Sequence, residues 1–572
     1  MSLFSQPQLN RTNKLAVSWN LLAAILGLLI LAFMGIGTSH LFSPYQLTQH
    51  TTISLDPSML PYYAFLSVYR MMVALFFSIL LTFIIGTICA KSKFYERLII
   101  PLIDILQAVP IPGFLSLSIF GFIALFPNQM LGPECAAIFT IITSQVWNMI
   151  LSFYQSLKTA PAHFEEIAKT FHLHPWHQFW QIEVPFTLPN LVWNAMLSLS
   201  AGWFFVVASE AISIAHHTIM LPGIGSYIAT AVAQANWNAI SYAIFAMFLV
   251  IIIYDQLLFR PLMIWSKKFH LDPDLDAYTP RSHICFVQKT SMFKWIKRKI
   301  SGAFYQWILL GYRSQPGKPM KFDLSKAIKA LTLIIVMCSL IYGYTLTKQL
   351  IWGQIALTDL IHIFYLGLIT GTKVVALVIL CSLIWLPIGI KIGLSGVWSA
   401  RLQPVLQFIA SFPANLFFPC VVWSIVYFDL NQQLWTAPLM VLGSQWYILF
   451  NVIAGAQSIP KSLRQVTKVF HVKRLRQWQT LWIPSILPNL VTGMMTAAGG
   501  AWNASIVAEA VSWGHNKIQV EGLGQYIDQS TNNGHFIELT IGIITMCALV
   551  LLMNYTIWQP LHRYTQRRFR LN

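Results

Sequence analysis

Long apolar stretches, separated by shorter polar segments, run along almost the whole chain. A helix that crosses the roughly 30 Å core of a bilayer needs about 20 apolar residues. Six stretches near this length lie at 15–37, 62–89, 99–125, 137–157, 187–215 and 239–265. Six more lie at 327–347, 360–390, 402–428, 435–457, 487–513 and 539–559. The pattern predicts an all-α polytopic membrane protein with about 12 transmembrane helices.

The polar positions between these stretches repeat along the chain. Residues 161–227 match 460–526 at a constant offset of 299 residues and without a gap. The matched pairs include Pro161/Pro460, Lys169/Lys468, His172/His471, Pro185/Pro484, Trp203/Trp502, Glu210/Glu509, Gly223/Gly522 and Gly225/Gly524. Farther upstream the match continues at an offset of 303 residues, where Arg70 corresponds to Lys373. Such self-similarity indicates two fused, parallel halves, predicted at 1–265 and 327–572 and joined by a linker at 266–326.

Composition agrees with a membrane protein, because 56% of the residues are hydrophobic and only 10% are charged. Lys and Arg favour cytoplasmic loops, and all but four of the 37 fall in the termini, alternate loops, the linker or the span ends next to the linker. The exceptions are Arg70, Lys348, Lys373 and Lys517. Both termini are therefore predicted to be cytoplasmic. This topology accounts for the net charge of +18 without a nucleic-acid partner.

The linker at 266–326 is basic, and its apolar residues recur at helical spacing between Met292 and Trp307. This pattern predicts an interfacial amphipathic helix that lies on anionic lipid. Metal binding is not expected. The seven cysteines form no C-x-x-C pair, and His172, His174 and His177 lack carboxylate or cysteine companions at ligand spacing.

A repeated motif precedes the fifth apolar stretch of each half. In the loop at 158–186, Glu166-Ile167-Ala168 is followed after three residues by His172, and after nine more by Ile182-Glu183-Val184-Pro185. In the loop at 458–485, Gln465-Val466-Thr467, His471 and Leu481-Trp482-Ile483-Pro484 keep the same spacing. This spacing resembles the E-A-A, three residues, G, nine residues, I-x-L-P loop of permeases from binding-protein-dependent importers of the ATP-binding-cassette class.

The resemblance implies that each loop forms a coupling helix, which docks on an ATPase subunit and transmits its ATP-driven closure to the membrane helices. The residues predicted to contribute to this contact are Glu166, Ala168, Lys169, His172 and Pro185 in the first half and Gln465, Lys468, His471 and Pro484 in the second. Histidine replaces the family glycine in both copies, and the second copy lacks the Glu-Ala-Ala triplet. The two docking surfaces are therefore predicted to be unequal.

Glu210 and Glu509 lie toward the outer ends of the fifth stretches of the two halves, and each is followed 13 residues later by a Gly-x-Gly pair. This arrangement resembles permeases of the nitrate, taurine and sulfonate type, which implies a small-anion importer. Arg70, Glu210, Lys373 and Glu509 are candidates for the translocation path, because ionisable residues inside spans are costly and often functional. The glutamates could instead cap a wet helix end, and the two cations could hold an anion or extend to the membrane interface.

The leading hypothesis is a non-enzymatic permease subunit of an ATP-driven importer in the bacterial cytoplasmic (inner) membrane. Its expected partners are two copies of an ATPase subunit, a periplasmic or extracellular solute-binding protein and membrane lipid. ATP and Mg²⁺ belong to the partner, and no cofactor is expected here, because the glycines near Lys318 lack the spacing and the Ser or Thr of a phosphate loop. The alternative is a secondary carrier of the major facilitator kind, although residues 90–97 lack that group's glycine-rich, Asp-Arg-containing loop.

Overall fold

The computed structural model describes residues 53–108, 111–214, 217–269, 357–513 and 516–569, together with Met337, Ile341 and Thr345. The first predicted span and the linker, apart from the residues up to 269, lie outside this part of the chain, and so does nearly all of the seventh span. The chain divides into two compact units. The described part of the smaller unit is mainly 159–187, and the larger unit contains most of the other described residues.

Helices make up most of the described chain. In the first half they are α2 (Leu60–Lys91), α3 (Lys93–Ala108), α4 (Ile111–Leu125), α5 (Leu131–Lys158), α6 (Ala162–Thr170), α7 (Pro175–Gln178), α8 (Val184–Glu210), α9 (Ile224–Ala233), α10 (Trp237–Tyr254) and α11 (Arg260–Ser266). In the second half they are α14 (Leu357–Leu394), α15 (Gly396–Ser411), α16 (Phe418–Tyr427), α17 (Gln432–Thr436), α18 (Leu439–Leu442), α19 (Gln445–Gln457), α20 (Lys461–Val469), α21 (Arg474–Gln477), α22 (Ile483–Ala508), α23 (Leu523–Asn533), α24 (Phe536–Met553) and α25 (Gln559–Phe569).

Among the described residues, six helices are long and apolar enough to cross a membrane, or up to nine if each bent pair counts as one span. The prediction of a helical, polytopic membrane protein is confirmed. The count of about 12 spans stays a prediction, because two of the predicted stretches lie largely outside the described residues.

Proline breaks stretches that the sequence predicts as single spans. The stretch 402–428 consists of α15 and a second helical segment that ends with α16, and the two are bent by 75°. Pro413 at the break is extended, with φ −65° and ψ 116°, because proline cannot donate the backbone hydrogen bond of a continuing helix. The matching stretch 99–125 likewise consists of two helices, α3 and α4.

Each fifth span is shorter than its apolar run. α8 ends at Glu210 and α22 at Ala508, whereas the predicted spans continue to 215 and 513. An antiparallel hairpin follows each helix: β1 (Ala211–Ile214) pairs with β2 (His217–Met220), and β3 (Ala510–Trp513) pairs with β4 (Asn516–Gln519). The regular structure of the described residues is thus helical apart from these hairpins, whose apolar strands cannot be distinguished from the end of an apolar helix by hydropathy.

Four π-helical turns of five residues also follow the repeat. They are Phe179–Glu183 and Trp478–Trp482 before the fifth spans, and Asp255–Phe259 and Asn554–Trp558 after α10 and α24. The members of each pair are 299 residues apart. The repeat therefore extends to local irregularities of the backbone.

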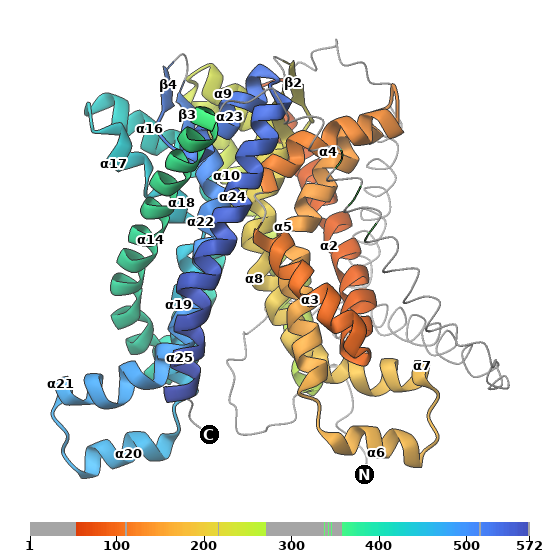
Figure 1. Cartoon of the computed structure of the whole chain (residues 1–572), viewed down its shortest axis with the longest axis vertical. Coiled ribbons are helices and arrows are strands. Elements are labelled where there is room, and N and C mark those ends of the chain that lie inside the picture. Colours follow the sequence, from red (N-terminus) through yellow and green to blue (C-terminus); the bar gives the residue numbers. More distant parts are fainter. Residues whose placement is uncertain are drawn as a thin grey trace, which may run out of the picture. The chain divides into compact units, whose positions relative to one another are not determined.

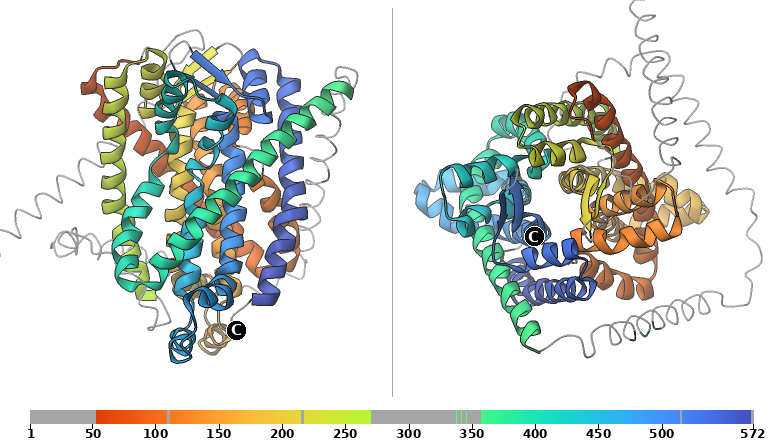
Figure 2. Two further views of the ribbon diagram at one scale, coloured as in Figure 1. Left: turned by 90° about the vertical axis from the view of Figure 1, so that its left-hand side faces the viewer. Right: turned by 90° about the horizontal axis from the view of Figure 1, so that it is seen from above.

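Equivalent elements of the two halves pack across each other in the larger unit. α3 packs against α24, and α15, which matches α3, packs against α10. In the same way, β1 contacts α23 and β3 contacts α9. Figure 2 shows the yellow and blue strands of the hairpins at one end of this unit, and Figure 1 shows α20, α21 and α25 at the opposite end.

Candidate functional site

α6, the helix of the first coupling loop, ends in a hydrogen-bonded cap. The N–H of His172 donates to the carbonyl of Lys169 (3.1 Å), and the N–H of Leu173 donates to the carbonyl of Ala168 (2.9 Å). These two bonds form a Schellman motif. Its left-handed residue is His172, with φ 47°, a conformation that glycine adopts without steric cost.

α20, in the second coupling loop, ends in the same way. His471 has φ 46°, and the N–H of Val472 donates to the carbonyl of Thr467 (3.1 Å). Both histidines that replace the family glycine are therefore the left-handed residues that stop a coupling helix. Lys468 lies on α20, but its side chain is outside the described part of the structure.

A short helix and a π-helical turn connect each cap to a long helix. α7 leads through one turn into α8, and α21 leads through the other into α22. Each turn stands just before a proline, Pro185 or Pro484. Proline clashes with the carbonyl four residues earlier in an α-helix, and the wider π turn gives it room. The coupling loops are thus continuous with α8 and α22.

Both coupling helices expose the same apolar pair. Ile167 and Phe171 are 42% and 71% exposed, and Val466 and Phe470 are 48% and 74% exposed. Residues four apart lie on one helix face, so each pair forms an apolar ridge. These ridges are candidates for the predicted contact with an ATPase subunit, since contiguous exposed apolar surface is typical of interaction sites.

Other residues that the sequence predicts to take part in coupling lie near these ridges. Glu166 is exposed, as is Gln465 at the matching position of α20, whereas Ala168 is buried and does not contribute to the exposed face. Lys169 forms an exposed ion pair with Glu165 (2.8 Å). The hydrogen bond from Lys169 lowers the pKa of the Glu165 carboxyl below its ordinary value.

Glu210, at the end of α8, lies in a closed polar cradle. Its Oε1 accepts hydrogen bonds from Ser67 Oγ (2.6 Å) and Arg70 Nη1 (2.7 Å), and its Oε2 accepts one from the N–H of Gly225 (2.6 Å). The carboxylate therefore caps the first turn of α9, where a negative charge is stabilised. A Cβ at Gly223 would overlap this carboxylate, which explains the first glycine of the Gly-x-Gly pair.

Arg70 binds a second carboxylate in addition to Glu210. Its Nε donates to Glu134 Oε2 (2.6 Å) and its Nη2 to Glu134 Oε1 (2.5 Å), which is the bidentate geometry that guanidinium groups favour. The side chains of Arg70, Glu134 and Glu210 are at most 3% exposed. Two of the alternatives from the sequence are therefore wrong. Arg70 does not extend to the membrane interface, and Glu210 does not cap a solvent-exposed helix end. Sequence reasoning missed Glu134, although a lone carboxylate in an apolar helix is a usable signal.

Glu509 occupies the matching cradle of the second half. Its carboxylate accepts hydrogen bonds from Thr370 Oγ1 (2.9 Å), Lys373 Nζ (3.3 Å) and the N–H of Gly524 (2.7 Å). Lys373 also donates to the carbonyl of Glu521 (2.7 Å) and is 15% exposed. The described contacts thus give Lys373 one carboxylate partner, whereas Arg70 has two.

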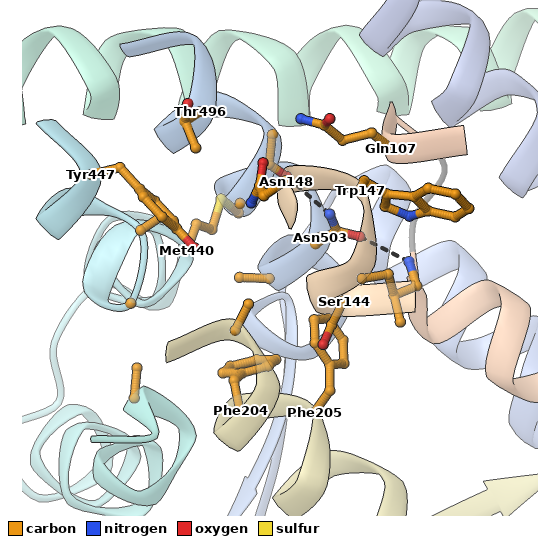
Figure 3. Close-up of a pocket in the computed structure, with 18 of the residues that line it drawn as sticks. Gln107, Ser144, Trp147, Asn148, Phe204, Phe205, Met440, Tyr447, Thr496 and Asn503 are labelled. Atoms are coloured by element: carbon orange, nitrogen blue, oxygen red, sulfur yellow. Dashed lines mark hydrogen bonds between the residues drawn. The ribbon is translucent and has the colours of Figure 1, made fainter. Parts of the chain in front are cut away.

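A cavity of about 110 Å³ lies in the larger unit, among residues of both halves (Figure 3). No Asp, Glu, Lys, Arg or His is among the side chains that line it. Its hydrogen-bonding groups are neutral and include Gln107, Thr143, Ser144, Asn148, Ser444, Tyr447, Thr496 and Asn503. Asn503 joins the halves, because its Oδ1 accepts a bond from the N–H of Ile111 (2.8 Å), drawn as a dashed line in Figure 3.

The cavity lining uses matching positions of the two halves. At the offset of 299 residues, Ser144, Asn148, Ala201, Phe204 and Phe205 correspond to Gly443, Tyr447, Gly500, Asn503 and Ala504. The cavity therefore lies where matching parts of the two repeats meet. The side chains that the two halves contribute differ in polarity, because Phe204 of one half corresponds to Asn503 of the other.

Arg70, Glu210, Lys373 and Glu509 are not among the residues that line this cavity. Their role in the translocation path stays a prediction, while their observed contacts connect helix ends to one another. The cavity residues were missed from sequence because single neutral polar side chains also occur in spans that merely pack together.

A helical membrane protein with two repeated halves, two coupling loops and a shared cavity has the architecture of a solute permease. Residues 82–259 and 384–571 each match the family described as binding-protein-dependent transport system inner membrane component. The two matches together cover more than half of the chain. The chain belongs to this family and carries its domain twice. The family consists of non-catalytic membrane components without a cofactor.

Individual relatives are distant. The bicarbonate transport system permease protein CmpB of Synechococcus elongatus is 26% identical over 194 residues, which are 34% of this chain and 66% of the relative. The nitrate import permease protein NrtB of Leptolyngbya laminosa is 27% identical over 178 residues, 31% of this chain and 60% of the relative. The chain thus matches these relatives over about two thirds of their length or less.

Proposed function

We propose that this chain is the complete membrane-spanning pair of an ATP-driven importer for a small anion. The observation that carries the proposal is the shared cavity, to which equivalent positions of both halves contribute. In permeases built from two repeats, the solute site lies at the interface of the repeats. One fused chain then supplies both walls of the translocation path.

The coupling loops supply the mechanical input in this proposal. α22 begins beyond the π turn that follows α21, and Thr496, Gly500 and Asn503 of the same helix line the cavity. α8 connects the first coupling loop to Ala201 and Phe204 in the same manner. A displacement of either coupling helix is thereby transmitted along one helix to the cavity wall. ATP binding shifts the equilibrium of states only if the ATPase contacts these helices differently in each state.

The partners of this permease are a pair of ATPase subunits on the cytoplasmic side and a soluble solute-binding protein on the other. The excess of Lys and Arg in alternate loops supports cytoplasmic termini and coupling loops. The hairpins, α9 and α23 lie at the end of the larger unit opposite α20 (Figure 1), and this end receives the binding protein. The whole complex resides in the bacterial inner membrane.

The cavity fits a small oxyanion such as nitrate, bicarbonate or a sulfonate headgroup. Its volume of about 110 Å³ has room for several waters or one small solute. Neutral hydroxyl and amide donors can bind an anion without the strong attraction of a fixed cation, which would slow its release. The names of the two relatives, one a bicarbonate permease and one a nitrate permease, support the same solute class.

A charge placed in the cavity tests this solute class. Asn148→Asp adds a negative charge to the lining, and Asn148→Leu is the matched control that removes the amide without adding charge. We expect ATP-dependent nitrate uptake by proteoliposomes to fall about tenfold in the Leu variant, for the loss of one hydrogen bond. Uptake by the Asp variant should fall about a hundredfold or more, because the added carboxylate and the anionic solute would repel each other by several kcal/mol in a confined site.

The ATPase rate is measured in parallel and should remain within about twofold of the wild type in both variants. Equal uptake by the Asp and Leu variants would contradict an anion in this cavity. Loss of ATPase stimulation in both would indicate a folding or coupling defect, and Ser144→Asp, also in the lining, then repeats the test from another helix position.

A further inference from the structure

The two coupling segments carry opposite net charge. The segment 159–187 contains three carboxylates and one lysine, a net charge of −2 with histidine neutral. The matching segment 458–486 contains six Lys and Arg residues and no carboxylate, a net charge of +6. The general excess of cations on cytoplasmic loops does not explain why one copy is acidic.

The charge differences fall at matching positions, where Glu165, Lys473 and Arg476 are exposed and Arg464 is half-buried. Glu165 and His174 of the first segment correspond to Arg464 and Lys473 of the second. The carboxylate of Glu165 is 67% exposed, and Lys473 and Arg476 are exposed as well. Arg464 forms a hydrogen bond within the segment's own surroundings, because its Nη2 donates to the carbonyl of Ala456 (2.9 Å). Among the described side chains, Lys473 and Arg476 are therefore the cations that can contact a partner.

Two apolar positions match between the segments, although the second segment also exposes Val469 and Leu475. Ile167 and Phe171 on the first, and Val466 and Phe470 on the second, are exposed to almost the same degree. The left-handed cap and the π turn are also shared. The same apolar ridge therefore meets the same kind of pocket, while the charges at its rim differ.

An anionic lipid surface is the other partner that a basic amphipathic helix such as α20 can have. It would repel the acidic first segment, whose shape is the same. The shared shape therefore favours one class of protein partner for both segments. Charges at the rim of an interface then determine which partner surface each segment accepts.

We propose that the second coupling segment docks in an apolar socket with an acidic rim, and that the first docks in a socket without one. This inference rests on the proposed function, in which each segment contacts an ATPase subunit. Two copies of one ATPase chain would present the same rim to both segments, and one of the two contacts would then juxtapose like charges. The ATPase pair is therefore composed of two different chains.

Photo-cross-linking in the assembled transporter tests the proposal. Benzoylphenylalanine replaces Phe171 or Phe470 in the full chain, which is assembled with its ATPase subunits in nanodiscs that contain phosphatidylcholine and the anionic lipid phosphatidylglycerol. Mass spectrometry then identifies the cross-linked peptides. We expect the two positions to label different ATPase sequences, with Asp and Glu enriched around the site labelled from position 470.

Charge variants give the second readout. Reversal of the exposed cations by K473E and R476E together should lower the adduct at position 470 about tenfold, because complementary charge raises association rates by this order or more. The adduct at position 171 should remain within about twofold. E165R is the matched variant of the first segment and should leave both adducts within about twofold, because the first socket has no acidic rim. Salt should weaken the contact at 470 selectively, since the screening length falls from about 10 Å at 0.1 M to about 3 Å at 1 M.

Three results would overturn the inference and leave the proposed function in place. One is labelling of the same peptide of one ATPase chain from both positions. Another is an adduct at position 470 that the charge reversal does not change. Labelling of lipid alone from position 470 would also overturn it, in favour of a membrane-bound α20. If neither position labelled an ATPase, the proposed function itself would fail.

Discussion

Arg70→Lys is the substitution for which the structure makes the sharpest prediction of stability. Arg70 donates to two carboxylates, Glu134 and Glu210, and all three side chains are buried. A lysine keeps the positive charge but has no planar fork, so it cannot bind Glu134 at two points and Glu210 at the same time. One carboxylate is then left buried without its cation.

The expected loss is about 3–5 kcal/mol of unfolding free energy, the usual cost of breaking a buried ion pair from one side. The double variant R70K/E134Q removes the orphaned charge. It leaves one lysine against one carboxylate, the arrangement observed for Lys373 and Glu509 in the second half. We expect it to recover about 2 kcal/mol or more of the loss, as partners in one network couple strongly.

Thermal unfolding in detergent, followed by intrinsic tryptophan fluorescence at fixed salt, measures these differences. Lys373→Arg is the control, because its cation has one carboxylate partner among the described contacts and is 15% exposed; its effect should stay below about 1 kcal/mol. The reasoning is refuted if R70K melts like the wild type, or if adding E134Q lowers the melting temperature further.

Three further sets of substitutions test separate parts of the fold by the same melting assay. Gly225→Ala should lower the free energy of unfolding by about 3 kcal/mol, because the new Cβ would overlap a backbone carbonyl of α8. Gly396→Ala is the control and should lower it by less than about 1 kcal/mol, because the space around this residue is open. Equal losses of stability in the two variants would contradict this packing. His172→Gly and His471→Gly should each stabilise the protein by about 1 kcal/mol, since both residues are left-handed, and a loss of stability would show that the histidine side chains matter more than the backbone. Burial raises the pKa of Asp528 to about 6, so the folded state binds this proton more tightly than the unfolded state, and stability should fall as the pH rises from about 4 through about 6. Asp528→Asn should remove that part of the pH dependence, and an unchanged profile would contradict the assignment.

The sequence predicts the features that depend on residue type at a fixed spacing. The apolar stretches, the repeat and the two coupling loops are of this kind. The glycine position of the coupling motif is an instructive case, since histidine stands there in both copies and the backbone is still left-handed. The motif position therefore specifies a left-handed backbone conformation. Residues other than glycine, such as histidine, can adopt this conformation at a cost in conformational free energy.

Features that depend on tertiary contact are not readable from the sequence. From the sequence alone, Arg70 was compatible with a position at the membrane interface. The residues near it in the sequence do not indicate that its guanidinium group binds Glu134, which is 64 residues away. The hairpins after α8 and α22 continue an apolar run without a change in composition. The cavity depends on which neutral polar side chains of separate spans come together, as Asn148 and Asn503 do, and no periodicity within one span determines that.

Uptake of labelled nitrate into proteoliposomes tests the central claim most directly. The vesicles contain this chain with its ATPase pair and internal ATP, and the binding protein is added outside. Uptake should require ATP, the ATPases and the binding protein, and the double variant F171A/F470A should abolish it while the chain still melts normally. Full uptake by the chain alone, driven by a proton gradient and unaffected by these two substitutions, would contradict the account.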